Sequence, residues 1–124
     1  MGGRDGLRSA LIVDDHASFR SAARALLQGD GFEVVGESED AAGALAAVAQ
    51  LRPAIVLLDI GLPDGNGFEV AERLARGDDP PVVILISSRE VAWYRRRLAK
   101  SPARGFIAKG ELSAAAVEAL MDGA

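Results

Sequence analysis

The feature that most constrains the fold is an apolar run at residues 54–58, Ala-Ile-Val-Leu-Leu, which ends at the carboxylate of Asp59. The run contains β-branched residues, follows Pro53 and precedes a loop rich in Pro, Gly and Asn at residues 60–67. Such a segment predicts a strand buried on both faces. Because a charge at the end of a buried strand must reach water or find partners, Asp59 predicts a polar site at this strand end.

Four more apolar runs of strand length alternate with segments of helical periodicity. The expected strands are residues 10–13, 32–36, 82–86 and 105–108, with 32–36 at a sheet edge and 82–86 in a central position. The apolar positions of the five expected helices are Phe19, Ala22, Ala23, Leu26, Leu27; Ala41, Ala44, Leu45, Val48, Leu51; Phe68, Ala71, Leu74, Ala75; Val91, Tyr94, Leu98; and Leu112, Ala115, Ala116, Ala119, Leu120. This alternation predicts an α/β fold, a doubly wound (βα)5 unit with a five-stranded parallel sheet.

Composition limits the class of protein. A chain of 124 residues without cysteine predicts one domain with no disulfide or thiolate metal site, and fits a cytoplasmic location. No apolar run approaches the length of a membrane span, and the net charge of −4 argues against direct nucleic-acid binding by this chain alone. We expect residues 1–7 to form a flexible leader and 8–122 the domain, with no second domain in the chain.

Polar residues follow four of the five expected strands. These are Asp14 and Asp15, then Asp59, then Ser87 and Ser88, and finally Lys109. In parallel sheets ligands bind outside the carboxyl ends of the strands, so these side chains are expected to meet there. Each pair of carboxylates at about 5 Å costs on the order of 3 kcal/mol at an effective dielectric of about 20, which predicts a bound cation.

The ligand types favour Mg²⁺, with Mn²⁺ as an alternative, because the donors are carboxylate oxygens. A metal ion and the Lys109 ammonium would neutralise charge on a transferring phosphoryl group, and the Ser87 hydroxyl would donate to one of its oxygens. Asp59 is the best placed nucleophile because Asp14 and Asp15 are adjacent and suit the metal. The set therefore predicts an aspartyl phosphate at Asp59.

Each of these polar residues, considered alone, also has a simpler structural role. Asp14, Asp15 or His16 would serve to cap the first helix, and either serine would cap the fourth. Lys109, considered alone, would be a solvated surface lysine. His16 is not expected to be catalytic. Independent capping does not explain polar residues at the ends of four different strands, which favours a shared site.

Several motifs resemble the receiver domain of bacterial two-component response regulators. They are Leu-Ile-Val-Asp-Asp-His at 11–16, Leu-Leu-Asp-Ile-Gly-Leu-Pro-Asp-Gly-Asn-Gly at 57–67, Ile-Ser-Ser at 86–88 and Gly-Phe-Ile-Ala-Lys at 105–109. The chain is most similar to receivers of the NarL/LuxR type, which precede a helix-turn-helix DNA-binding domain. The resemblance implies the flavodoxin-like strand order 2-1-3-4-5 and a regulatory domain rather than an enzyme.

The resemblance also implies a role for individual residues. Asp59 would be the phosphoacceptor, phosphorylated by a sensor histidine kinase or by acetyl phosphate. The metal ligands would be Asp15, Asp14 mainly through water, Asp59, and the backbone carbonyl of Gly61. The switch and phosphoryl-binding residues would be Ser87, with its neighbour Ser88, Phe106 and Lys109.

The sequence departs from the family pattern at three places. Gly110 stands where receivers usually have a proline after a cis peptide bond, and the sequence leaves the local loop geometry open. Phe106 lacks the hydroxyl of the commoner tyrosine, so it can switch only through ring position. Gly61 and Arg89 occupy positions that influence the phosphoryl lifetime in the family, and Arg89 is a candidate modulator.

The expected output surface is formed by the fourth helix, the fifth strand and the fifth helix, and it carries a basic cluster. Residues 89–109 carry seven basic residues and one acidic residue. Within it we define a partner face as Trp93, Arg95, Arg96 and Arg97, with Trp93 expected to be exposed because it lies off the apolar stripe of its helix. Phosphorylation is expected to draw Ser87 inward, let Phe106 turn, and promote a homodimer.

Three other classes of protein share parts of this pattern. A haloacid-dehalogenase-type phosphatase needs an acid at position 61, where this chain has glycine, and a flavodoxin needs a hydroxyl-rich loop where it has Asp14 and Asp15. A receiver-like interaction module that does not depend on phosphorylation stays open as the alternative.

Overall fold

The computed structural model describes residues 8–122, so the predicted leader at 1–7 lies outside the described residues. The main sheet consists of β1 (Arg8–Val13), β2 (Phe32–Ser38), β3 (Ile55–Asp59), β6 (Val82–Ser87) and β7 (Gly105–Ala108). All pairings in it are parallel and the order is β2-β1-β3-β6-β7. Counting only these strands, this is the predicted order 2-1-3-4-5.

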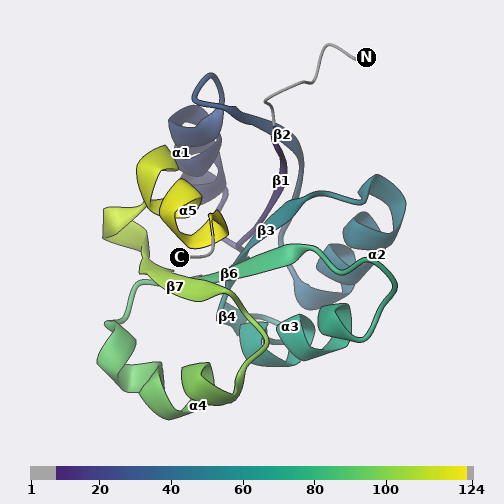
Figure 1. The fold of residues 1–124 in the computed structure, drawn as a ribbon, viewed down its shortest axis with the longest axis vertical. Helices are drawn as coiled ribbons and strands as arrows, with labels where there is room; N and C mark the ends of the chain where they lie inside the picture. Colours follow the sequence, from purple (N-terminus) through teal and green to yellow (C-terminus); the bar gives the residue numbers. More distant parts are fainter. Residues whose placement is uncertain (1–7, 123–124) are drawn as a thin grey trace.

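Helices cover both faces of this sheet (Figure 1). The helices are α1 (Ala17–Leu27), α2 (Ala41–Leu51), α3 (Gly67–Ala75), α4 (Arg95–Lys100) and α5 (Ala114–Met121). Residues of α1 and α5 pack with one set of strand side chains, and residues of α2, α3 and α4 pack with the other set. The doubly wound architecture is therefore confirmed. None of the helices in the 8–122 region is long and apolar enough to span a membrane.

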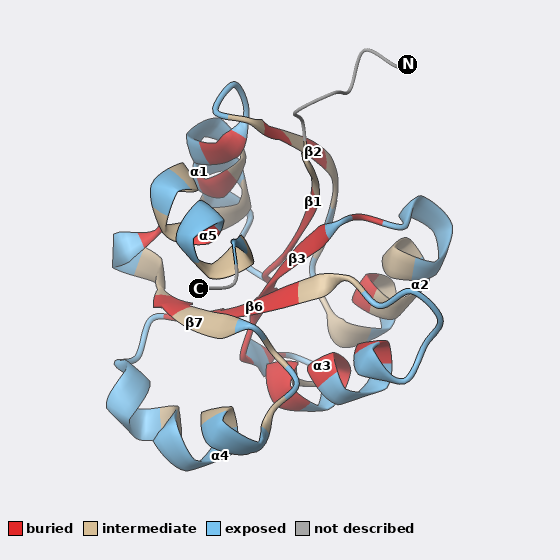
Figure 2. Cartoon of the chain, in the orientation of Figure 1, coloured by how far each residue is buried: buried red, intermediate tan, exposed pale blue. Residues whose placement is uncertain are grey.

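The central strands are the most deeply buried part of the molecule (Figure 2). Every residue of β3 is buried, and β6 is buried from Val83 onward. Strands covered by helices on both faces need apolar side chains in both directions, which explains their continuous apolar runs. β2 lies at an edge, as its polar residues predicted.

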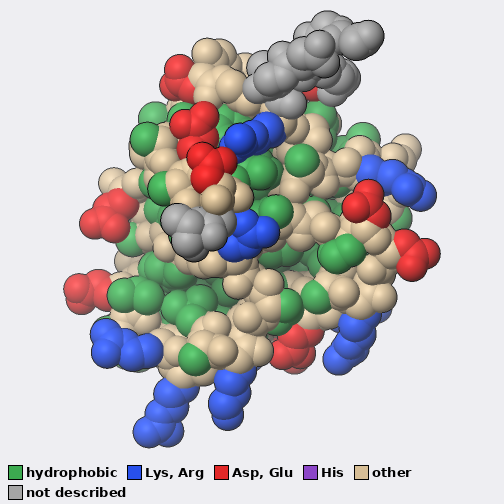
Figure 3. Space-filling view, in the orientation of Figure 1, with side chains coloured by type: hydrophobic (Ala, Val, Ile, Leu, Met, Phe, Trp, Pro, Cys, Tyr) green, Lys and Arg blue, Asp and Glu red, His purple; other side chains and the backbone are tan. Residues whose placement is uncertain are grey.

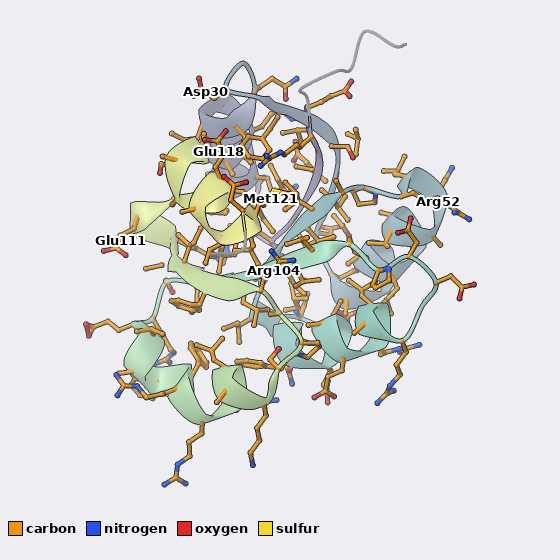
Figure 4. The ribbon with its side chains drawn as sticks, viewed as in Figure 1. Asp30, Arg52, Arg104, Glu111, Glu118 and Met121 are labelled. Carbon is orange, nitrogen blue, oxygen red and sulfur yellow. The ribbon has the colours of Figure 1, made fainter. Side chains whose placement is uncertain are left out.

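Polar side chains fix several helix ends. Asp40, Asn66 and Ser113 each accept a hydrogen bond from an amide in the first turn of α2, α3 and α5, respectively. At the other end of α5, the Arg104 guanidinium donates to the carbonyls of Leu120 and Met121. Figure 4 shows Arg104 reaching this helix end from the chain before β7. These contacts set the ends of helices that are too short to be stable alone.

All five predicted apolar stripes are wrong in part. Leu51 of α2, Ala75 of α3, and Ala115 and Ala119 of α5 are exposed, and the predicted stripe of α5 omits Val117, which is buried. In α1 only Ala23 and Leu27 are buried, and Leu26 is 44% exposed, because consecutive residues point about 100° apart and only one of each adjacent pair faces the sheet.

The predicted fourth helix is not one continuous α-helix. It begins as the 3₁₀ helix η1 (Val91–Tyr94), with Val91 44% exposed, and continues as the short α4. This segment lies beside the edge strand β7, where it has less sheet to cover.

Three small elements had no predicted counterpart. β4 (Gly61–Leu62) and β5 (Gly65–Asn66) form an antiparallel hairpin, and the 3₁₀ helix η2 (Lys109–Glu111) precedes α5. Leu112, which was assigned to the last helix, lies before it and is buried. Elements this short carry no periodicity from which to predict them.

Candidate functional site

The ends of the strands bring the predicted polar residues to one edge of the sheet. Val13 pairs with Leu58 and Asp59 pairs with Ile86, so Asp14, Asp59 and Ser87 stand at neighbouring strand ends. Their exposed fractions are only 0%, 5% and 5%, and among residues 8–122 they are the buried polar or charged residues. Burial of polar groups at adjacent positions is costly unless they interact, which indicates a functional cluster rather than separate surface groups.

Lys109 joins two of these carboxylates. Its Nζ lies 2.6 Å from Asp14 Oδ2 and 3.2 Å from Asp59 Oδ2. The ammonium also lies 4.8 Å from the centre of the Phe19 ring. With a side chain that is 16% exposed, Lys109 is not the solvated lysine of the simpler interpretation.

The surroundings shift the pKa values of Asp14 and Asp59 in opposite directions. Burial raises the pKa of the Asp59 carboxyl, and the adjacent Asp14 charge raises it further against the opposing effect of Lys109. Burial alone would also raise the pKa of Asp14, but the close ammonium of Lys109 and hydrogen bonds from His16 bring it below its ordinary value. Burial opposes the charge of Lys109 as well, yet the two carboxylates raise its pKa overall. Asp59 is therefore the carboxylate that its surroundings stabilise least.

A group of ligand atoms suited to a cation lies at the same place. One atom each from Asp14, Asp15, His16 and Asp59 lie within 4.8 Å of one another. The His16 ring is in this group because its Nδ1 lies 3.0 Å from both Asp14 Oδ1 and Asp15 Oδ1. Its presence there was not predicted, since a single histidine after an acidic pair carries no spacing pattern.

The helix-capping alternative fails for the acidic pair. His16 is the N-cap residue of α1, and its side chain makes no capping hydrogen bond. Asp14 instead accepts a hydrogen bond from the His16 backbone amide, at 2.8 Å, within the loop that precedes the helix. Arg20 of α1 donates to the Asp14 carbonyl at 2.7 Å and thereby holds the loop.

Two glycines that follow Asp59 contact it through the backbone, and of the two only Gly67 has to be a glycine. The Gly61 amide donates to Asp59 Oδ1 at 3.2 Å and so helps to orient the carboxylate. Gly67, the first residue of α3, is packed so closely that a Cβ there would lie 2.7 Å from the Asp59 carbonyl oxygen and 3.0 Å from the Ile60 Cα. Glycine at 67 therefore allows α3 to begin directly against the end of β3.

Ser87 has a partner that the sequence did not reveal. Its Oγ accepts a hydrogen bond from the Arg89 amide at 3.0 Å and shares a second one with the Tyr94 hydroxyl at 3.3 Å. The Tyr94 ring lies 6.1 Å from the half-buried ring of Phe106. Tyr94 was expected only as an apolar position of the fourth helix, because its contact with Ser87 depends on how η1 packs.

The remaining predicted residues lie at the surface around this cluster. Ser88 and Arg89 are exposed, and the Arg89 guanidinium lies 4.4 Å from the ring centre of Trp93.

The backbone between residues 8 and 122 contains no cis peptide bond, so the Lys109–Gly110 bond that the sequence left open is trans.

The partner face is exposed throughout. Trp93 is 68% exposed, as predicted, and Arg95, Arg96 and Arg97 are exposed on α4. Figure 3 shows basic side chains extending from the α4 end of the molecule, while acidic side chains gather over α1 and α5. The Arg97 guanidinium lies 4.4 Å from the Phe68 ring centre, which attaches α4 to α3.

Comparison with known proteins identifies the class. The sequence profile of the response regulator receiver domain matches residues 10–121, and the chain belongs to this family. The signal receiver domain of the response regulator NarL from Mycobacterium tuberculosis superposes with a TM-score of 0.79 at 32% identity, covering 94% of this chain and 98% of that chain, so within the family this chain is of the NarL/LuxR type.

Two curated relatives are transcription regulators. The chain is 38% identical over 101 residues to the virulence-factor transcription regulator BvgA of Bordetella pertussis, covering 82% of this chain and 48% of BvgA. It is 32% identical over 103 residues to the DNA-binding transcriptional activator EvgA of Escherichia coli K12, covering 83% of this chain and 50% of EvgA. The chain thus spans about half the length of the curated relatives it matches.

A solved structure agrees with this assignment. A LuxR-family two-component response regulator from Aurantimonas sp. SI85-9A1 superposes with a TM-score of 0.84 at 25% identity, covering 94% of this chain and 86% of that chain. The receiver resemblance and the fold predicted from the sequence are therefore confirmed. Receiver domains are regulatory domains rather than conventional enzymes.

Proposed function

We propose that this receiver accepts a phosphoryl group on Asp59 and that the modification changes the surface formed by α4, β7 and α5. The observation that carries the proposal is the ion pair between Lys109 Nζ and Asp59 Oδ2, at 3.2 Å, beside the buried Asp14. This arrangement sets a candidate nucleophile, a cation for the phosphoryl oxygens and further acidic ligands side by side. No simpler structural role requires all three.

The donor set fits a hard divalent cation. Three carboxylates with ligand atoms within 4.8 Å of one another suit Mg²⁺ or Mn²⁺, and Asp14 Oδ2 accepts no hydrogen bond of good geometry even though Lys109 lies close to it. Asp14, Asp15 and Asp59 would hold the ion, together with the Gly61 carbonyl that the family resemblance suggests. When bound, the ion supplies charge neutralisation at the phosphoryl oxygens.

Residues of this chain would perform the transfer of the phosphoryl group. An oxygen of Asp59 forms the bond to phosphorus while the bond between phosphorus and the donor's leaving group breaks, and that group departs with the bonding electrons. Lys109 neutralises charge on the phosphoryl oxygens, and the Ser87 hydroxyl donates to one of them. Arg89 remains the candidate modulator of the phosphoryl lifetime, and in this structure its guanidinium stacks on the Trp93 ring.

The partners proposed for this receiver follow from its family. The donor would be a sensor histidine kinase, and the phosphorylated form would dimerise and act in the cytoplasm. Because BvgA and EvgA are described as transcription regulators, we propose a DNA-binding output outside this chain. No direct binding to nucleic acid or membrane by the chain itself is expected, given its net charge of −4.

The test is the intact mass of the protein after incubation with Mg²⁺ and acetyl phosphate. We expect a gain of one phosphoryl mass in the wild type and none in Asp59→Asn. Asp64→Asn is the matched control, because Asp64 is an exposed carboxylate of the same loop that bonds the amides of Ala41 and Ala42 instead. Removing the metal with EDTA should prevent the gain.

Lack of any mass gain in the wild type, with either acetyl phosphate or phosphoramidate, would refute the proposal. The phosphorylation-independent interaction module would then be the better account.

A further inference from the structure

Tyr94 supplies the hydroxyl that the switch aromatic Phe106 lacks. It is the single tyrosine of the sequence, and its hydroxyl shares a hydrogen bond with Ser87 Oγ at 3.3 Å. Its ring lies between two others, 5.8 Å from Phe68 on α3 and 6.1 Å from Phe106 on β7. One side chain thus touches the predicted phosphoryl-binding hydroxyl and both neighbouring elements.

The hydrogen bond between Ser87 and Tyr94 has the properties of a releasable contact. Its length is greater than the 2.7–2.8 Å typical of hydroxyl pairs, so it is weak. Ser87 also accepts from the Arg89 amide, and a hydroxyl has one proton to donate and two acceptor positions. If the Ser87 hydroxyl turns to donate its single proton to a phosphoryl oxygen, that proton is no longer available to Tyr94, and the weak contact with Tyr94 costs little to break.

The segment that contains Tyr94 is held weakly by other contacts. Neither η1 nor α4 has a buried residue, and Figure 2 shows both largely exposed. Within residues 91–100, Tyr94 and Leu98 are the hydrophobic side chains that pack against the core, and Arg97 adds its contact with the Phe68 ring. Loss of the Tyr94 contact would therefore affect the whole segment, including the partner face that it carries.

We propose that the Tyr94 hydroxyl tethers Ser87 in the unphosphorylated protein, and that phosphorylation of Asp59 draws Ser87 away and releases residues 91–100. Tyr94 acts here as a positioning residue, since it contacts Ser87 and not the phosphoryl group. The inference rests on the proposed function and names how that function reaches the partner face. Because the tether and the phosphoryl group compete for Ser87, removing the tether must strengthen binding of the group.

The first experiment titrates the protein with beryllium trifluoride and Mg²⁺, a mimic of the phosphoryl group, by calorimetry. Tyr94→Phe removes only the hydroxyl and keeps the ring, so we expect it to bind the mimic about two- to fivefold more tightly than the wild type, the range of a weak neutral hydrogen bond. In the Ser87→Ala background Tyr94→Phe should have no further effect, because the partner is already absent. Unchanged or weaker binding by Tyr94→Phe would overturn the proposal.

The second readout is the fluorescence of Trp93, the only tryptophan and the neighbour of Tyr94. Its indole stacks on Arg89 at 4.4 Å, so release of residues 91–100 should change its emission. We expect the mimic to change the emission of the wild type, and Tyr94→Phe without the mimic to shift part of the way toward that value. A Tyr94→Phe spectrum identical to the free wild type would contradict the tether.

Urea unfolding without any mimic separates this inference from the proposed function. The shifts in midpoint caused by Tyr94→Phe and Ser87→Ala should sum to more than the shift of the double variant, since both remove one shared bond. Additive shifts would overturn the tether. Failure of the wild type to bind the mimic would instead refute the proposed function, while the unfolding cycle would still decide whether the tether exists.

Discussion

The cluster at the strand ends and the segment of residues 91–100 lie close together but are built very differently. Asp14, Asp59 and Ser87 are at most 5% exposed and stand at the ends of strands with parallel neighbours on both sides. The segment has no buried residue and consists of a four-residue 3₁₀ helix and a six-residue α-helix. Chemistry that needs fixed geometry is thus placed on the rigid sheet, and the surface that is proposed to change is placed where few contacts oppose a change.

The largest expected effect on the free energy of unfolding comes from truncating apolar side chains, one in each region. Ile84→Ala, in the fully buried middle of β6, should lower the free energy of unfolding by about 3–4 kcal/mol. Leu98→Ala, in half-buried surroundings on α4, should lower it by only about 1 kcal/mol. Urea unfolding measures both. Equal losses would show that α4 is as tightly packed as the sheet and would remove the contrast between the regions.

Gly67→Ala tests the framework behind Asp59. A Cβ at this position would meet the Asp59 carbonyl and Ile60 at 3.0 Å or less, so we expect a loss of about 2–3 kcal/mol in unfolding free energy. Gly110→Ala is the matched control, since a Cβ there meets no atom within 4 Å, and its effect should stay within about 0.5 kcal/mol. A tolerated Gly67→Ala would mean that β3 and α3 separate easily.

Asp59→Asn should stabilise the metal-free protein. Burial and the Asp14 charge raise the pKa of Asp59, so its charged form is disfavoured in the folded state, and a neutral amide of the same shape should gain about 1 kcal/mol. Thermal unfolding in EDTA at neutral pH measures the difference. Added Mg²⁺ should reduce it by stabilising the wild type. Destabilisation by Asp59→Asn would show that the ion pair with Lys109 outweighs burial and repulsion.

The smallest expected effect on the free energy of unfolding is that of Glu37 on β2, the edge strand opposite β7. Hydrogen bonds from Arg24 and Arg20, against a smaller opposing effect of burial, lower the pKa of Glu37, and Glu37→Gln should cost about 0.5 kcal/mol at pH 7. Because the folded pKa is below the ordinary 4.5, this stabilisation is complete above that value and is lost as the pH falls through the folded pKa. Unfolding of both proteins between pH 3 and 7 checks this. A difference independent of pH would exclude the charge as its origin.

The fold was predictable because its central strands are buried on both faces. Continuous apolar runs such as residues 82–86 have no other location than a covered sheet, and the polar residues that end them mark one edge. The convergence of Asp14, Asp59, Ser87 and Lys109 followed from that rule, and the structure confirms that these side chains lie at adjacent strand ends. Their roles in phosphoryl transfer stay predictions.

The helical periodicity of apolar residues predicted burial least well where the sheet covers only part of a helix. Leu26 and Val91 fit an apolar stripe in the sequence, yet each is 44% exposed. A pattern gives the relative direction of side chains but does not say how wide a strip of the helix the sheet covers. That width depends on whether a helix lies over the middle of the sheet or beside an edge strand such as β7.

By itself, the sequence determined the order of strands and helices, the family, and the residue types that gather at the carboxyl edge of the sheet, because alternating burial and strand-end polarity are local properties of the chain. Only the tertiary structure decided which atoms meet. Lys109 approaches Asp14 more closely than Asp59, His16 lies between two carboxylates, and the Tyr94 hydroxyl reaches Ser87. Such contacts depend on the packing of elements far apart in sequence, to within an ångström, and no local pattern records them.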